Sequence, residues 1–121
     1  MPTRSLSSSV LKWPDAKSVV RGLKGWTAEN LKNRKDVERI GFFGSYARGD
    51  WGVGSDLDIV IVVTKSEGPF ERRAAKWNLG GLPVPADLLV YTEDEWAALD
   101  MKRRFTKMLR EETVWVYEKN V

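Results

Sequence analysis

The sequence contains neither cysteine nor histidine among its 121 residues. The absence of cysteine excludes disulfide bonds and zinc sites with thiolate ligands. The absence of histidine removes the commonest general base and the commonest transition-metal ligand. Any bound metal must therefore take oxygen ligands, as Mg²⁺, Mn²⁺ and Ca²⁺ do. Any acid–base chemistry must use Asp, Glu, Lys or Tyr.

Long apolar runs are also absent. No run approaches the roughly 20 residues of a membrane-spanning helix, and the N-terminal MPTRSLSSSV has no apolar signal-peptide region. We therefore expect a cytoplasmic protein that does not contact a membrane. The net charge of +3 is too small to favour nucleic-acid binding by itself. The length predicts one domain, residues 15–121, preceded by a flexible Ser-rich segment, residues 1–14.

The apolar pattern predicts helices that alternate with strands. The segment LDIVIVV is almost entirely apolar and β-branched, which indicates a strand in the middle of a sheet that is covered on both faces. Thr92 and Glu95 have the spacing of a capping box. This order predicts an α/β (α+β) fold, a mixed sheet of about four strands with helices packed against it. The predicted strands are 37–43, 57–63, 83–91 and 113–117, and the predicted helices are 16–31, 45–48 (capped by Ser45), 69–79 and 92–111, the last with a break near Asp100.

Two further patterns concern burial. In the last helix, Met101, Phe105 and Met108 are expected to form a buried stripe, opposite a solvated basic face. Six tryptophans are many for a chain of this length, and exposed ones are typical of partner interfaces. Their surroundings predict two groups: Trp77, Trp96 and Trp115 in the core, and Trp13, Trp26 and Trp51 as candidates for exposure.

Two aspartates, Asp56 and Asp58, stand at the start of the central strand. Alternate side chains of a strand point to the same face, so these carboxylates are expected side by side. A divalent cation would relieve their mutual repulsion. Asp87 lies within an apolar strand, where an unpaired carboxylate is costly, and could supply a third ligand. The alternatives are a turn cap for Asp56, a solvated strand edge for Asp58 and an exposed edge-strand face for Asp87.

The pair Gly44–Ser45 follows a predicted strand and precedes a predicted helix. Glycine lets a phosphate approach the backbone, and N–H groups at a helix N-terminus bind anions. Arg48, about one turn later, could add a guanidinium to the same phosphate. The glycine spacing fits neither the P-loop nor the dinucleotide-binding fingerprint. Taken alone, the segment could equally be an ordinary turn.

Together these motifs resemble the minimal nucleotidyltransferase (MNT) domain of the DNA polymerase beta-type superfamily. The family pattern is Gly-Ser, ten residues and then Asp-x-Asp, which Gly44–Ser45 and Asp56–Asp58 match. The family's third aspartate lies in a strand of the type xDLLV, which Asp87 in ADLLV matches. The resemblance covers residues 36–118, and the Ser-rich N-terminal segment lies outside it.

The resemblance implies roles for these residues. Asp56 and Asp58 would hold two Mg²⁺ ions, with Mn²⁺ as a substitute, and Asp87 would join them and help to activate the acceptor. Gly44 and Ser45 would bind the β- and γ-phosphates of ATP or another nucleoside triphosphate, with help from Arg48. The implied reaction is attack of a hydroxyl on the α-phosphorus, with pyrophosphate leaving.

The resemblance also implies a partner. MNT proteins commonly act as antitoxins that transfer AMP from ATP to a tyrosine of a HEPN-type toxin, and a homo-oligomer or a complex with the toxin is compatible with this. A small-molecule nucleotidyltransferase of the aminoglycoside-modifying type is one alternative, although such enzymes usually carry an additional helical domain. An antitoxin that only occludes its partner is another. The least favoured alternative is a nucleic-acid-binding module that uses the basic residues of the last helix.

Overall fold

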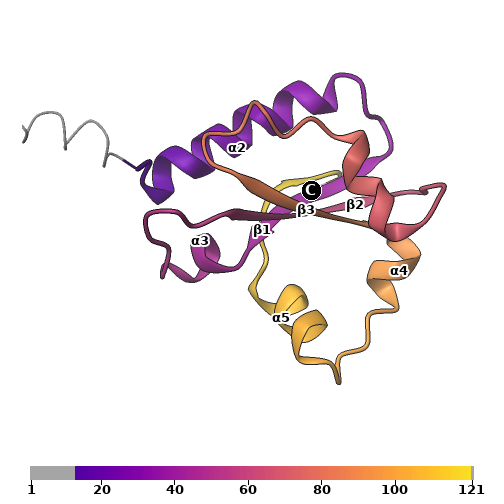
Figure 1. Ribbon diagram of the computed structural model, residues 1–121. Coiled ribbons are helices and arrows are strands. Elements are labelled where there is room, and N and C mark those ends of the chain that lie inside the picture. Colours follow the sequence, from indigo (N-terminus) through magenta and orange to yellow (C-terminus); the bar gives the residue numbers. More distant parts are fainter. Residues whose placement is uncertain (1–12, 121) are drawn as a thin grey trace, which may run out of the picture.

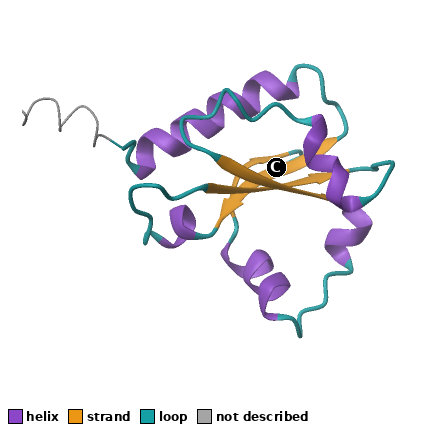
Figure 2. Cartoon of the chain, viewed as in Figure 1, coloured by secondary structure: helices purple, strands orange, loops and turns teal. Residues whose placement is uncertain are grey.

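The computed structural model describes residues 13–120, so most of the segment expected to be flexible, 1–14, lies outside the described residues. Helices and strands alternate along the chain, as the sequence predicts (Figures 1 and 2). The elements are α2 (Ala16–Leu31), β1 (Val37–Phe43), α3 (Ser45–Arg48), β2 (Leu57–Val63), the 3₁₀ helix η1 (Phe70–Lys76), β3 (Ala86–Thr92), α4 (Glu93–Ala97), α5 (Arg104–Glu112) and β4 (Val114–Glu118).

The four strands form one mixed sheet in the order β3-β2-β1-β4. β1 is antiparallel to both β2 and β4, whereas β2 and β3 are parallel. β2 occupies an interior position, and its residues after Asp58 are buried. The expected mixed sheet of four strands, with LDIVIVV inside it, is therefore confirmed.

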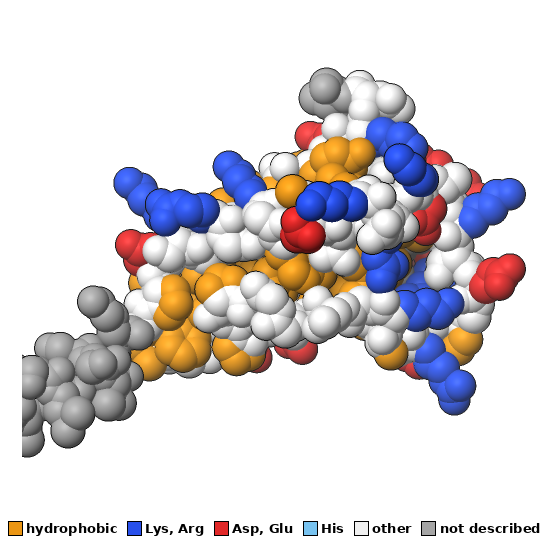
Figure 3. Space-filling model, turned by 90° about the horizontal axis from the view of Figure 1, so that it is seen from above, with side chains coloured by type: hydrophobic (Ala, Val, Ile, Leu, Met, Phe, Trp, Pro, Cys, Tyr) orange, Lys and Arg blue, Asp and Glu red, His pale blue; other side chains and the backbone are white. Residues whose placement is uncertain are grey.

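Helix α2 lies across one face of the sheet (Figure 1). The helix begins after Asp15, whose Oδ1 accepts a hydrogen bond of 2.8 Å from the Ser18 N–H and so caps the first turn. Val19, Leu23 and Trp26 point into the larger of two hydrophobic clusters. Viewed from this side, Lys and Arg side chains project outward and hydrophobic side chains are visible between them (Figure 3).

Helices α4 and α5 lie on the opposite side of the sheet from α2 (Figure 2), whereas the short α3 after β1 packs Tyr46 into the larger cluster. On the α4 and α5 side, the second cluster is smaller and consists of Phe43, Val60, Val62, Trp96 and Leu109. None of the helices formed by residues 13–120 is long and apolar enough to cross a membrane.

An ion pair between a buried arginine and a partly exposed glutamate joins η1 to α4. Arg73 is only 7% exposed, and its two terminal nitrogens contact the two Glu95 carboxylate oxygens at 2.5 and 3.0 Å. Glu95 also completes the expected capping box with Thr92. The fork of hydrogen bonds suits a guanidinium and a carboxylate, so the pair fixes the start of α4 against η1.

Two element predictions need correction. The helix expected over 69–79 is a 3₁₀ helix that ends at Lys76. The strand expected from residue 83 begins at Ala86, because Pro83 and Pro85 have no N–H group for the sheet. The break expected near Asp100 is confirmed, because the segment 92–111 forms two short helices, α4 and α5, on either side of it.

Two burial predictions are wrong as well. Met101 and Phe105 are 41% and 48% exposed, so the expected buried stripe is absent from this segment and Leu109 is the buried residue of α5. Trp26 is buried rather than exposed, and its Nε1–H donates to the Asn78 carbonyl at 2.8 Å. Trp77 and Trp96 are buried as expected, whereas Trp13, Trp51 and Trp115 are each half-buried.

Candidate active site

The aspartates gather at one end of the strands, where β1 ends and β2 and β3 begin. This follows from strand direction, because β1 is antiparallel to β2 and β2 is parallel to β3. Asp58 pairs in register with Asp87 on one side and with Phe43 on the other. Two carboxylates that are 29 positions apart in the sequence thus become direct neighbours on adjacent strands. We call this end of the sheet, with Asp56, Asp58 and Asp87, the aspartate corner.

Strand alternation gives the direction of these side chains. Asp58 shares its face of β2 with Val60 and Val62, which belong to the cluster beneath α4 and α5. Asp58 is half-buried, and its burial, followed by the negative charges of Asp87 and Asp56, raises its pKa. Nearby Arg48 opposes that shift. The corner therefore concentrates negative charge that a cation would relieve.

The aspartate corner has the chemistry of a metal centre without its full geometry. Among residues 13–120, no three acidic side chains converge as a ligand set in the conformations that they adopt. Asp56 lies just before β2 and is exposed, and Asp87 is exposed on the edge strand β3. The donors fit Mg²⁺ chemically, since all are carboxylate oxygens and they repel one another. Asp87 therefore lies on an exposed edge-strand face, as one interpretation expects, and its place beside Asp58 is compatible with the third ligand of the other.

Gly44 links the Gly-Ser turn to the aspartates. Its backbone has φ 78° and ψ −149°, a conformation that side-chain-bearing residues rarely adopt. A Cβ built on Gly44 would also run into the Asp58 carboxylate. The N-cap of α3 is thus Gly44, and Ser45 is the first helical residue rather than the cap that the sequence suggests. Only glycine combines this turn with so close an approach to Asp58.

Arg48 lies at the end of α3 and is exposed. Its Nε is 3.2 Å from a carboxylate oxygen of Asp50, and both side chains are open to solvent. Exposed pairs of this kind are weak, so the guanidinium could exchange Asp50 for a phosphate at little cost. The structure thus brings Gly44, Ser45 and the three aspartates to the same end of the sheet, and it places Arg48 one helical turn after Ser45.

The comparison with protein families decides the classification. A family model described as a nucleotidyltransferase domain matches residues 25–116, about three quarters of the chain. The chain belongs to the nucleotidyltransferase domain family. Among curated protein sequences, none matches this nucleotidyltransferase domain significantly.

Solved structures support the same fold. A candidate nucleotidyltransferase from Sulfolobus solfataricus is 23% identical, with a TM-score of 0.61, and the match covers 89% of this chain and 91% of that one. A toxin–antitoxin structure with AMP-PNP is 14% identical, with a TM-score of 0.49 and coverage of 88% and 76%. A mutant MntA–HpeT toxin–antitoxin structure is 12% identical, with a TM-score of 0.46 and coverage of 88% and 75%. The last two similarities are too distant to carry an argument.

An aromatic clamp, Trp13, Tyr46 and Trp51, holds α3 of the nucleotidyltransferase domain. The Trp13 Nε1–H donates to the Tyr46 hydroxyl at 2.9 Å, and the Tyr46 ring stacks on Trp51 at 5.6 Å. The clamp ties the segment before α2 to the Gly-Ser turn and to the loop leading to Asp56. Sequence reasoning missed it. The only signal was the presence of aromatic residues beside the motif, which does not identify their partners.

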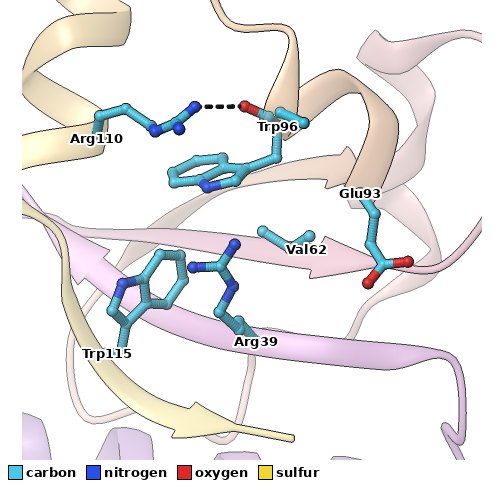
Figure 4. A pocket seen from close by; sticks show the side chains of 7 residues that line it. Arg39, Val62, Glu93, Trp96, Arg110 and Trp115 are labelled. Carbon is cyan, nitrogen blue, oxygen red and sulfur yellow. Dashed lines mark hydrogen bonds between the residues drawn. The ribbon is translucent and has the colours of Figure 1, made fainter.

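A cavity of about 350 Å³ lies towards the other end of the sheet face that carries the aspartates. The Arg39 guanidinium lies 4.7 Å from the centre of the Trp115 ring and 5.6 Å from that of Trp96, and Arg110 donates to the Trp96 carbonyl at 3.0 Å (Figure 4). Glu93 lines the same cavity, so its charge is mixed. These contacts join β1, α4, α5 and β4 and account for the cavity as a packing feature of the nucleotidyltransferase domain.

Proposed function

We propose that this protein is a Mg²⁺-dependent nucleotidyltransferase that transfers a nucleoside monophosphate, AMP from ATP, to a hydroxyl acceptor. The observation that carries the proposal is the register of β2 and β3, which places Asp58 beside Asp87. Gly44 contributes the adjoining turn, in close contact with Asp58. A phosphate-binding turn beside paired carboxylates is the arrangement that metal-assisted phosphoryl transfer requires.

One group of residues would bind the metal ions, and another would bind the phosphates. Asp56, Asp58 and Asp87 would hold two Mg²⁺ ions, or Mn²⁺ in their place. When bound, such ions neutralise the charge of a triphosphate and of the reacting oxygens. The backbone at Gly44 and Ser45 would hold the β- and γ-phosphates. Arg48 would leave Asp50 to join them, because an exposed ion pair is easily exchanged.

The proposed reaction forms one bond to phosphorus and breaks another. The acceptor hydroxyl oxygen forms a bond with the α-phosphorus of ATP, and the bond from that phosphorus to the bridging β-phosphate oxygen breaks. Pyrophosphate leaves with the electron pair of that bond. Asp87, which is exposed, would take the hydroxyl proton and later return it to solvent. Catalysis then rests on positioning and charge neutralisation, which need no histidine.

We further propose that the acceptor is a tyrosine of a partner HEPN-type toxin, so that the protein acts as an antitoxin. The motif-level resemblance to MNT domains supports this choice. The exposure of Asp56 and Asp87 also supports it, because an open corner suits an acceptor that brings its own surface. Small molecules would need a more enclosed pocket.

Labelled ATP tests the transfer. The protein would be co-expressed with the product of the neighbouring gene, purified and incubated with ATP labelled at the α-phosphate and Mg²⁺. We expect label on the partner, and loss of at least about 100-fold in the D58N variant, because stabilisation of developing charge is removed. The matched control is D36N. Asp36 is also exposed at the start of a strand, but it lies at the opposite edge of the sheet.

Three results would contradict the proposal, the third only in its acceptor. Equal labelling by wild type and D58N would place the reaction elsewhere. An absence of transfer, with the partner still inhibited by D58N, would assign the protein to antitoxins that act by occlusion. Transfer to an aminoglycoside but not to any protein would retain the chemistry and replace the acceptor.

A further inference from the structure

Helix α5 and the turn before it expose apolar side chains close to the aspartate corner. Met101 is 41% exposed and Phe105 is 48% exposed. Leu109 is the buried residue of α5, and Met108 packs partly buried against the same cluster. Two large apolar side chains are thus left in solvent, in a segment where the sequence predicts that they are buried.

The position of Phe105 ties this exposure to the site. Its ring contacts Phe43 edge to face, with 6.0 Å between ring centres. Phe43 is the cross-strand partner of Asp58, and such partners project from the same face. One side of Phe105 is therefore held two contacts away from the Asp58 carboxylate, while the rest of the ring is open to solvent.

The same segment carries an excess of positive charge, although the Asp100 carboxylate lies in the turn and accepts a hydrogen bond from the Lys102 N–H. All of the basic side chains around Phe105 are exposed, and within residues 13–120 none of them lies within 4.0 Å of a carboxylate oxygen. We call this segment, with Met101 and Phe105, the α5 surface. Its basic residues are Lys102, Arg103, Arg104 and Lys107.

We propose that the α5 surface docks an acidic segment of the acceptor protein and delivers that protein's hydroxyl to the aspartate corner. This inference rests on the proposed function. Carboxylates of the segment would pair with the four basic side chains, and an apolar side chain would cover Phe105 and Met101. Charge complementarity of this kind chiefly sets register and the rate of association.

An acidic peptide fits this surface better than RNA does. A polynucleotide carries a negative charge on every phosphate, and its backbone would have to pass the aspartate corner, which Phe105 approaches through Phe43. A peptide carries its charges at separate positions, so it can place carboxylates on α5 and a neutral hydroxyl residue at the corner. Exposed aromatic and arginine side chains are also the residues that dominate protein interfaces.

Fluorescence anisotropy tests the docking without any need for catalysis. The probe is a labelled random copolymer of Glu and Tyr, added to the full-length protein in the absence of nucleotide. We expect the K102E/R104E double variant, and separately F105A, to weaken binding by about tenfold. The matched control is K17E/R21E on α2, which makes the same charge change on the other side of the sheet and should bind within about twofold of wild type.

The outcomes separate the two proposals. Equal binding by wild type and K102E/R104E would overturn the docking surface, even if labelled AMP is still transferred to a partner. Tighter binding of poly(U) than of the copolymer would overturn it in favour of RNA. Binding that depends on α5, with no transfer of AMP to any protein, would support the docking surface and contradict the proposed function. Circular dichroism checks that each variant is folded.

Discussion

The two faces of the sheet are packed in different ways. On the α2 face, Val19 and Leu23 are fully buried in the larger cluster, and this cluster also includes Trp77 and Val84 from the connection between β2 and β3. On the other face, five buried residues form the smaller cluster, and the remaining area carries carboxylates and the exposed Phe105. The comparison indicates that the α2 face supplies most of the stability, so the other face is free to hold charges that cost stability.

The largest expected change in stability is on the α2 face. Leu23→Ala should lower the free energy of unfolding by about 2–5 kcal/mol, because Leu23 has no exposed surface and its loss leaves a cavity. Urea denaturation followed by circular dichroism measures the change. Transfer activity per folded molecule should stay within about twofold of wild type, and a larger loss would mean that the two faces are not independent.

A smaller loss of stability is expected at Gly44, which belongs both to the fold and to the candidate site. Gly44→Ala should destabilise the protein by about 1–3 kcal/mol, because alanine is strained at φ 78° and its methyl group meets the Asp58 carboxylate. Thermal unfolding measures this loss. Gly49→Ala is the control for backbone strain alone, since Gly49 also has a positive φ but no atom within 4 Å of an added Cβ. Equal losses in both variants would exclude the contact with Asp58 as a cause.

The pair between Arg73 and Glu95 should give stability a measurable pH dependence. The hydrogen bonds that Arg73 donates to Glu95 hold the pKa of Glu95 below its ordinary value of 4.5. A lowered pKa contributes stability that is present above the unfolded value and is lost as the pH falls through the folded value. Glu95→Gln should therefore cost about 1 kcal/mol at pH 7, a small effect because the side chain is partly exposed.

Melting temperatures from pH 7 to pH 3 test this pair. The difference between wild type and Glu95→Gln should shrink below pH 4.5, where Glu95 begins to lose its charge in the unfolded chain. A difference that stays constant over the whole range would mean that packing, rather than charge, accounts for the loss.

The smallest effect is expected at Phe105. Its replacement by alanine should change the free energy of unfolding by about 0.5 kcal/mol, because the side chain is 48% exposed and touches the buried cluster through its edge-to-face contact with Phe43. Phe43→Ala is the contrasting variant, since Phe43 is 7% exposed and should cost roughly 3 kcal/mol or more. Denaturation curves of the two variants would sharpen the comparison. A large loss for Phe105→Ala would make it a structural residue.

The sequence predicted the parts of this fold that depend on local patterns. The bounds of β1 and β2, the short helix α3 and the capping box at Thr92 all follow from local preferences and are confirmed. The approach of Asp87 to Asp58 was reached through the motif, because strand order is not visible in local patterns. The 3₁₀ form of η1 was missed because an apolar pattern cannot separate it from an α-helix.

Burial near α5 was mispredicted for a related reason. The stripe assumed that Met101 and Phe105 both face the core. Met101 instead lies in the turn before α5, and Phe105 contacts Phe43 with one side of its ring while the rest of the side chain stays exposed. The aromatic clamp at Tyr46 was also out of reach, because its partner Trp13 lies 33 residues away. Sequence reasoning therefore identified the candidate site residues, and the structure shows which residues lie beside them.

The edge position of β3 has a consequence for solubility. Among the strands of residues 13–120, β3 pairs with β2 alone, so its other side presents backbone groups that a strand from another molecule could pair with. Two features oppose such pairing: Pro85 stands immediately before the strand, and the charged Asp87 interrupts its apolar sequence near the start. A carboxylate proposed for chemistry therefore also acts as a gatekeeper against aggregation, and its neutralisation would be expected to increase light scattering on storage.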